Sequence, residues 1–364
     1  MPAGFRRREF LAGLAALGAT AFLPDRVLRT RAQAPPGARR LDLHHHFGPP
    51  RWAKKHADAK RQGWEAFRDY TPAKAIEAMD KAGIETSFLS MTTPGIWFTD
   101  DFAAERQETI ALARDVNEYG ARMTSDYKGR FGLFAVLPLP DVDASLREIA
   151  YALDTLKADG VGLLTSYGDI WLGDARLQPV FDELNRRQAI VYTHPTDASC
   201  CHALANSSPS VVEWFTDTAR SIQSLIQDPP SSGRGDAAPS AATRYGGITF
   251  IWSHGGGALV GTTRVAGTVS ADALAGTPAP NSRLHHIRRF YYDTAGAANP
   301  IVMPALKRLL GGTSHIVYGT DYPFGGQEVP RAIADALQTV GFTPDELRGV
   351  DRENALRLLP KYRG

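Results

Sequence analysis

The sequence predicts an α/β fold of the TIM type, a parallel (β/α)8 barrel that forms a single domain with loop insertions. After about residue 40, short apolar runs alternate with helical patterns, which is the order of a parallel sheet whose strands are connected by helices. The runs are apolar throughout, as expected for strands covered on both faces. The 364 residues are 43% hydrophobic and 22% charged, and α/β barrels of this length commonly form one domain.

The first strand is expected at Arg40–Phe47, and an irregular stretch at Gly48–Tyr70 follows it. A helix is expected at Pro72–Ala82, because Thr71 can cap its N-terminus, proline suits the first helical position, and Gly83 follows its end.

The remaining strands are predicted where apolar runs stop at turn residues. They are Ile84–Ser90, Phe131–Leu137, Val161–Leu164, Ala189–His194, Ile248–His254, Phe290–Thr294 and His315–Thr320. Helices are predicted between them and after them, at Ala103–Tyr127, Asp143–Ala158, Leu177–Arg187, Val211–Ile226, Ile301–Leu310 and two further stretches near the C-terminus. Two segments rich in Pro, Ser, Gly and Ala, Asp228–Gly247 and Gly267–Ser282, are expected to be surface insertions.

Residues 1–34 have the layout of an export signal. Arg6, Arg7 and Arg8 precede an apolar run that ends at Leu23, and Ala32-Gln33-Ala34 offers a small-residue cleavage site. The pair Arg7-Arg8 followed by Phe10-Leu11 is similar to a twin-arginine signal. We therefore expect a barrel domain at residues 35–364 that the twin-arginine machinery exports to the periplasm or beyond. An uncleaved leader that anchors the protein is the alternative, because Pro35 would hinder cleavage.

Charge and cysteine content exclude two classes of protein. The leader carries six Arg against one Glu and one Asp, so its removal changes the formal net charge from +2 to −2. The mature chain thus offers no basic surface for nucleic acid. Cys200 and Cys201 are the two cysteines and they are adjacent, which is not a disulfide framework.

Polar side chains stand at the ends of four predicted strands. His44 and His46 point to one side of the first strand, because side chains alternate along a strand. His194, His254 and Asp321 end three other strands. In a barrel these strand ends share one face, and that face holds the active site. Histidines and a carboxylate there predict a single divalent ion, zinc by donor set, with manganese as the alternative.

The motifs around these residues resemble the amidohydrolase superfamily. They are Asp42-Leu-His44-His-His46, Thr193-His194-Pro195, Ser253-His254-Gly-Gly-Gly257 and Gly319-Thr-Asp321-Tyr-Pro-Phe324. The branch they most resemble contains aminocarboxymuconate-semialdehyde decarboxylase and 6-methylsalicylate decarboxylase. The resemblance implies that His44, His46 and His194 are metal ligands, that Asp321 ligates the metal or lies against it, and that His254 is catalytic. It also implies a homodimer.

Two reactions fit this site. In the first, a metal ion orients the carboxylate of an aromatic or unsaturated acid, and Asp321 protonates the carbon that loses carbon dioxide. In the second, a metal-bound water hydrolyses an amide, ester or lactone. Hydrolytic members of the superfamily that the chain resembles often bridge two metals with a lysine on the fourth strand. The strand at Val161–Leu164 carries no Lys or Glu, so the resemblance favours one metal and decarboxylation. An exported metal-binding or sugar-binding protein is the alternative that is not an enzyme, and it would not need His254.

The substrate is expected to be a small carboxylic acid. Arg51 and Arg264 each follow a predicted strand and could pair with its carboxylate, and Trp97 could stack on a planar ring. Trp52, Trp64, Phe98, Tyr167 and Trp171 also follow strand ends, where each could contact substrate or pack a loop. Asp217 and Arg220 match a helix motif of the branch that the chain resembles, and they could form a structural ion pair or support the residues of the site; we expect the structural ion pair.

Overall fold

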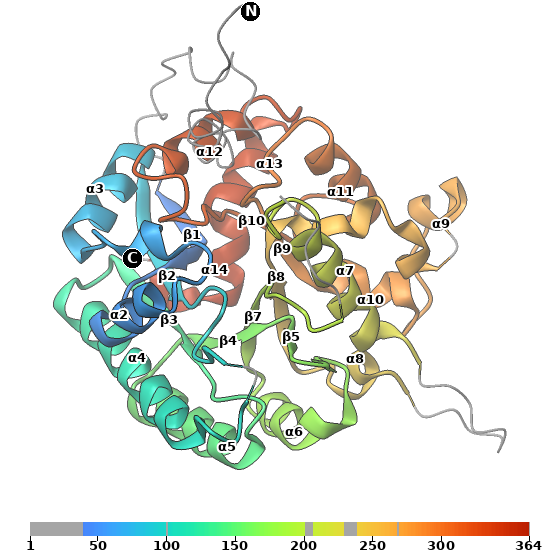
Figure 1. Cartoon of the computed structure of the whole chain (residues 1–364). Helices are drawn as coiled ribbons and strands as arrows, with labels where there is room; N and C mark the ends of the chain where they lie inside the picture. Colours follow the sequence, from blue (N-terminus) through green and yellow to red (C-terminus); the bar gives the residue numbers. More distant parts are fainter. Residues whose placement is uncertain (1–38, 100, 201–206, 229–238, 268, 364) are drawn as a thin grey trace, which may run out of the picture.

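The computed structural model describes residues 39–99, 101–200, 207–228, 239–267 and 269–363, so the predicted leader and Cys201 lie outside the described residues. Eight parallel strands form a barrel in the order β1-β2-β3-β4-β7-β8-β9-β10, with helices around it (Figure 1). The predicted TIM-type fold is confirmed. The strands are β1 Arg40–His46, β2 Ile84–Ser90, β3 Phe131–Val136, β4 Gly160–Leu164, β7 Ile190–His194, β8 Thr249–Trp252, β9 Tyr291–Asp293 and β10 Ile316–Val317.

The first and last strands close the barrel. The Leu43 amide donates to the Tyr318 carbonyl at 2.9 Å, and the His46 amide donates to the Tyr322 carbonyl at 2.7 Å. Tyr322 lies beyond β10, so the seam between β1 and the C-terminal part of the barrel continues past the last regular strand. Residues at this seam are therefore held by strands from opposite ends of the chain.

Helices cover the outside of the barrel (Figure 1). They are α2 Pro50–Ala59, α3 Pro72–Ala82, α4 Arg106–Asp126, α5 Val142–Ala150, α6 Gln178–Arg186, α7 Glu213–Ile226, α8 Ala241–Arg244, α9 Ala271–Ala275, α10 Arg283–Arg289, α11 Val302–Leu310, α12 Val329–Leu337, α13 Pro344–Arg348 and α14 Asn354–Leu358. A small hairpin, β5 Ser166–Tyr167 and β6 Ile170–Trp171, follows β4. Among the described residues, no helix is both long enough and apolar enough to cross a membrane.

The helix α3 has the predicted bounds, and its N-terminus is capped as predicted. The Thr71 hydroxyl accepts from the Lys74 amide, and Gly83 ends the helix in the left-handed conformation at φ 65°. The prediction of an irregular stretch at Gly48–Tyr70 is wrong, because α2 occupies much of it. Trp52 and His56 lie one turn apart and are both fully buried, so burial of one face stabilises a helix whose mean composition is polar.

Two strands are shorter than predicted because the chain bends sharply where they end. We expected strands to reach His254 and Thr320, but β8 ends at Trp252 and β10 ends at Val317. His254 and Asp321 both adopt positive φ, at 53° and 61°, which a regular strand does not allow. These two polar residues therefore lie on turns just beyond their strands.

Aromatic rings from neighbouring strands form a floor beneath the barrel mouth. The Phe134 ring stacks on the Tyr192 ring at 5.6 Å and on the Phe88 ring at 5.5 Å. Tyr362, near the C-terminus, packs edge-on against Phe88 at 4.9 Å. On its other side, Tyr192 meets the His44 ring at 5.3 Å. The polar residues at the strand ends thus stand on a rigid apolar layer.

Candidate metal and catalytic centre

Four of the polar side chains predicted at strand ends converge on one point. They are His44, His46, His194 and Asp321, and one ligand atom from each lies within 4.8 Å of the others. The Nε2 atoms of His44 and His46 are 3.1 Å apart, and each lies 3.0 Å from Asp321 Oδ1. His194 Nε2 lies 4.0 Å from the same oxygen. Four donors at this spacing can hold one ion.

Backbone carbonyls fix which ring nitrogen of His46 and of His194 faces this point. His46 Nδ1 lies 3.1 Å from the Ser90 carbonyl, and His194 Nδ1 lies 2.8 Å from the Pro195 carbonyl. A carbonyl can only accept, so both Nδ1 atoms carry the hydrogen and both Nε2 atoms present a lone pair. His194 Nε2 is buried without a hydrogen-bond partner. Buried lone pairs that converge beside a carboxylate fit a divalent cation.

Asp321 owes its position to the barrel seam. Its backbone amide donates to the His44 carbonyl at 2.8 Å, and φ is 61°, a conformation that costs energy for a residue other than glycine. The side chain is 23% exposed, whereas the three histidines are fully or almost fully buried. Asp321 is therefore the member of the cluster that reaches the open barrel mouth.

The carboxylates and the imidazoles set one another's charge. Burial alone would lower the pKa of His44, but Asp293 and Asp321 outweigh it and raise that pKa to about 10. Burial lowers the pKa of His194. Burial also disfavours the Asp321 carboxylate, yet the charge of His44 and hydrogen bonds from His44 and His46 hold the pKa of Asp321 well below its usual value. His44 is thus the most basic imidazole of the cluster, and basicity strengthens a bond to a cation.

His254 lies beside the cluster but outside it. Its ring centroid is 4.9 Å from that of His44. Its Nδ1 donates to the Ala295 carbonyl at 3.1 Å, and its Nε2 is buried without a partner. Burial lowers the pKa of His254, so the ring is neutral near pH 7 and offers a lone pair. His254 is thus next to the four candidate ligands without being one of the four.

Three glycines after His254 make its turn possible. Gly255, Gly256 and Gly257 have φ of 62°, 79° and 62°, a run that residues with a Cβ rarely adopt. A Cβ on Gly257 would lie 2.3 Å from the Phe215 carbonyl oxygen. The chain can therefore turn close against α7 and leave the His254 ring facing the cluster.

One residue at the centre was not predicted. Asp293 ends β9 and is fully buried, and its Oδ2 lies 2.8 Å from His44 Nδ1. Its Oδ1 accepts from the backbone amides of His254 at 2.9 Å and Ala295 at 3.0 Å. The signal that could have found it was present in the sequence, because a carboxylate, Asp293, is the penultimate residue of the predicted strand Phe290–Thr294.

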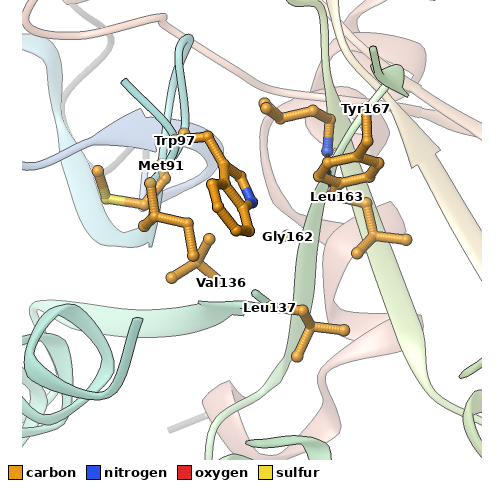
Figure 2. Close-up of a pocket in the computed structure, with 10 residues that line it drawn as sticks. Met91, Trp97, Val136, Leu137, Gly162, Leu163 and Tyr167 are labelled. Atoms are coloured by element: carbon orange, nitrogen blue, oxygen red, sulfur yellow. Dashed lines mark hydrogen bonds between the residues drawn. The ribbon is translucent and has the colours of Figure 1, made fainter. Parts of the chain in front are cut away.

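A small apolar cavity lies at the ends of β2, β3 and β4. Figure 2 shows the Trp97 indole on one side of it, with Leu163 and Tyr167 opposite. The cavity has a volume of about 10 Å³, and among the described residues its lining includes none of the four candidate ligands. The indole nitrogen of Trp97 donates to the Leu139 carbonyl. The cavity is lined by Met91, Gly95, Ile96, Trp97, Val136, Leu137, Gly162, Leu163, Leu164 and Tyr167.

The two arginines that the sequence suggested as partners of the substrate carboxylate are both exposed. Arg51 is exposed in the first turn of α2, and Arg264 is exposed in the helical turn Thr263–Ala266. Arg264 lines an open groove of about 670 Å³ together with Trp171 and Arg220. Within the described residues, the lining of this groove includes none of the four candidate ligands.

Other suggested residues contribute to packing. Trp52 is fully buried and donates to the Gly95 carbonyl at 2.6 Å, so it is a core residue. Arg220 donates to Asp217 at 2.8 Å within α7, which is the predicted ion pair. His45 points away from the cluster, lies 3.2 Å from Asp42 Oδ2 and stacks on Tyr322.

Comparisons with known proteins agree with this geometry. The model of a family described as amidohydrolase matches residues 41–361. The chain is 32% identical over 338 residues to Decarboxylase yanB of Aspergillus niger, covering 89% of this chain and 88% of that protein. It is 31% identical over 336 residues to the 6-methylsalicylic acid decarboxylase of Penicillium expansum, covering 89% of this chain and 97% of that protein.

Solved structures share the fold. A protein described as an amidohydrolase II superposes with a TM-score of 0.73 at 24% identity, covering 88% of this chain and 99% of that one. A dihydroxybenzoic acid decarboxylase from Polaromonas sp. JS666, solved with bound manganese and 2-nitroresorcinol, superposes with a TM-score of 0.69 at 19% identity, covering 90% of this chain and 98% of that one.

Proposed function

The chain belongs to the amidohydrolase family and is a carboxy-lyase of that superfamily, and from this premise we propose that it removes carbon dioxide from a hydroxybenzoic acid of the 6-methylsalicylate type. The observation that carries the proposal is the similarity over 89% of the chain to proteins named as decarboxylases, two of them 6-methylsalicylic acid decarboxylases.

One divalent ion is proposed at the centre, zinc by donor set and manganese as the alternative. His44, His46, His194 and Asp321 would hold it, and when bound it would orient the substrate carboxylate and neighbouring hydroxyl and stabilise the developing negative charge. A manganese-containing neighbour in fold supports the alternative metal. Arg51, Trp97 and Arg264 stay candidates for substrate contacts.

Asp321 is proposed to deliver the proton to the ring carbon. As the bond between the ring and the carboxylate breaks, its electron pair stays on the ring carbon, carbon dioxide leaves, and the proton from Asp321 completes the new C–H bond. The low pKa of Asp321 leaves it ionised at rest, so it must first take up from solvent water the proton that the reaction consumes and then pass that proton to the ring carbon. Neutral His254, with its free Nε2 lone pair, is suited to accept a hydrogen bond or a proton from the substrate hydroxyl.

The substitution Asp321→Asn tests this role. The amide is close in shape to the carboxylate and its oxygen can still bind a cation, so we expect most of the metal to be retained. Turnover should fall by about 100-fold or more, because a positioned acid typically contributes that much. Metal content and turnover are measured on the same samples. Turnover near the wild-type value would show that another group donates the proton, and would leave the decarboxylase assignment intact.

A product assay separates the candidate functions. Chelator-treated protein is reloaded with zinc or manganese and incubated with 6-methylsalicylate, with 2,6-dihydroxybenzoate and with simple lactones, and carbon dioxide and acid release are followed. Carbon dioxide from a benzoate is the expected result. Acid release alone would favour the hydrolase alternative and overturn the proposal. Neither product with either metal would favour an exported binding protein.

We also propose that the twin-arginine leader exports the enzyme and that the mature protein is a homodimer. The arginine pair and apolar run in residues 1–34 support export. The leader is tested by replacing Arg7 and Arg8 with lysine and measuring how much protein leaves the cytoplasm, which should fall sharply. Sedimentation of the mature protein measures its oligomeric state, and a monomer would contradict the dimer.

A further inference from the structure

A single buried carboxylate connects the metal cluster to His254. We propose that Asp293 is a positioning residue that holds His44 in the one tautomer able to bind the ion and fixes His254 beside it. The proposal depends on the metal site but not on the identity of the substrate. Metal titration can therefore contradict it while the proposed decarboxylase activity stands, and the reverse also holds.

The two oxygens of Asp293 have different partners. Oδ2 lies 2.8 Å from His44 Nδ1, and Oδ1 accepts from the backbone amide of His254 at 2.9 Å and from that of Ala295 at 3.0 Å. Ala295 in turn accepts from His254 Nδ1 at 3.1 Å through its carbonyl. The position of the His254 backbone and the direction of its ring therefore both depend on the segment that Asp293 anchors.

The contact with His44 differs in kind from those of the other two histidines. His46 and His194 donate their Nδ1 hydrogens to neutral carbonyls, whereas His44 faces a carboxylate that is fully buried. A carboxylate cannot donate a hydrogen bond when ionised, so His44 Nδ1 must carry a hydrogen, and the neutral ring then presents its lone pair at Nε2. The negative charge also strengthens Nε2 as a ligand, as carboxylate–histidine pairs do at metal sites.

Close packing holds the pair in place. A Cβ on Gly319 would lie 2.8 Å from His44 Cβ and 2.9 Å from Asp293 Cβ, so the segment just after β10 passes directly against both side chains. The Gly319 amide donates to the Thr294 hydroxyl at 3.0 Å, which fixes the residue next to Asp293. The carboxylate thus has little freedom to leave His44.

The substitution Asp293→Asn separates positioning from structure. The amide oxygen can take the place of Oδ1 and keep both backbone contacts, but the NH2 group then faces His44 Nδ1–H. Two donors cannot pair, so His44 must move its hydrogen to Nε2, where it points at the ion. We expect the dissociation constant for Mn²⁺, titrated alone into chelator-treated protein, to rise by about 10- to 100-fold, with a small change in melting temperature.

Compared with Asp293→Asn, the substitution Asp293→Ala should lower the melting temperature more and weaken Mn²⁺ binding less. It leaves the amides of His254 and Ala295 buried without an acceptor, which lowers the melting temperature more than the asparagine does. Water can enter the space and accept from His44 Nδ1, so Mn²⁺ binding should weaken less than in the asparagine variant. If Asp293 had only a structural role, the variant with the lower melting temperature would also bind Mn²⁺ more weakly.

The substitution Asp159→Asn is the matched control. Asp159 is also a buried carboxylate that accepts from a backbone amide, that of Leu133 at 2.9 Å, and from the Tyr362 hydroxyl at 2.9 Å, but it precedes β4 at the far end of the barrel. Its variant should bind Mn²⁺ like the wild type. Either of two results would overturn the proposal. The first is a dissociation constant of Asp293→Asn for Mn²⁺ within threefold of the wild type. The second is that the Asp293 variant with the lower melting temperature is also the one that binds Mn²⁺ more weakly.

Discussion

Replacing Gly319 with alanine should weaken metal binding, because the added methyl group would press against His44 and Asp293. The added Cβ would lie 2.8 Å from His44 Cβ, and 2.9 and 3.0 Å from Asp293 Cβ and Cγ. Carbon atoms in ordinary contact are about 3.5–4.0 Å apart, so His44, Asp293 or the strand itself must shift by roughly 0.5–1 Å. The two side chains are hydrogen-bonded to each other, and the displacement would therefore reach His44 Nε2.

The magnitudes follow from the crowding. Overpacking of a buried site costs about 1–3 kcal/mol, which for a chain of this size lowers the melting temperature by a few degrees. Misplacing a ligand together with its hydrogen-bond partner should weaken metal binding by about 10- to 100-fold. Scanning calorimetry of the chelator-treated protein measures the first effect, and calorimetric titration with Mn²⁺ measures the second.

Gly162→Ala is the control for this prediction. Gly162 lies in β4, but its added Cβ would approach nothing closer than 3.6 Å, the distance to the Phe134 carbonyl oxygen. We expect Mn²⁺ affinity to be unchanged and the melting temperature to move by less than it does for Gly319→Ala. Equal damage from both substitutions, or none from Gly319→Ala, would refute the steric reasoning.

Two further predictions concern stability. Burial lowers the pKa of His56 to about 4, so between pH 6.5 and pH 4 the unfolded chain takes up a proton that the folded protein does not, and stability falls as the pH falls. Between pH 7 and pH 5, the free energy of unfolding of His56→Phe should therefore fall by about 1–2 kcal/mol less than that of the wild type, as measured by denaturant unfolding. An equal fall in both proteins would contradict the lowered pKa of His56. Asn354 donates to the carbonyls of Thr313 at 2.8 Å and Ile316 at 2.7 Å while fully buried, so Asn354→Ala should lower the free energy of unfolding by about 2–4 kcal/mol. Asn354→Asp, which cannot donate through either oxygen when ionised, should be no better than alanine, and full stability in either variant would show that the two bonds contribute little.

The parts of the fold that could be predicted are those with a regular pattern. The helix α3 was predicted to the residue, because Thr71, Pro72 and Gly83 each mark a definite helical position. The helix α2 was missed because its composition is polar, and its stability comes from tertiary burial of Trp52 and His56, which no local pattern reveals.

The site shows a similar division. His44 and His46 were predicted to share one side of a strand, and their Nε2 atoms do meet. Asp293 was missed because a single carboxylate after a short strand is common, and its role depends on the packing of β9 against β1 across the barrel mouth. The positions of Arg51 and Arg264 depend on loop paths, which the sequence does not determine.

Because the metal centre lies at the seam between β1 and the end of the barrel, it can form only late in the synthesis of the chain. His46 and Asp321 lie 275 positions apart in sequence yet meet at 3.0 Å. During synthesis the site cannot form until nearly the whole polypeptide has left the ribosome, and a chain truncated before residue 321 would lack a donor however well its first strands had folded. Ion capture therefore reports that the two ends of the barrel have joined, and a bound ion would oppose their separation, because a ligand stabilises whichever state binds it.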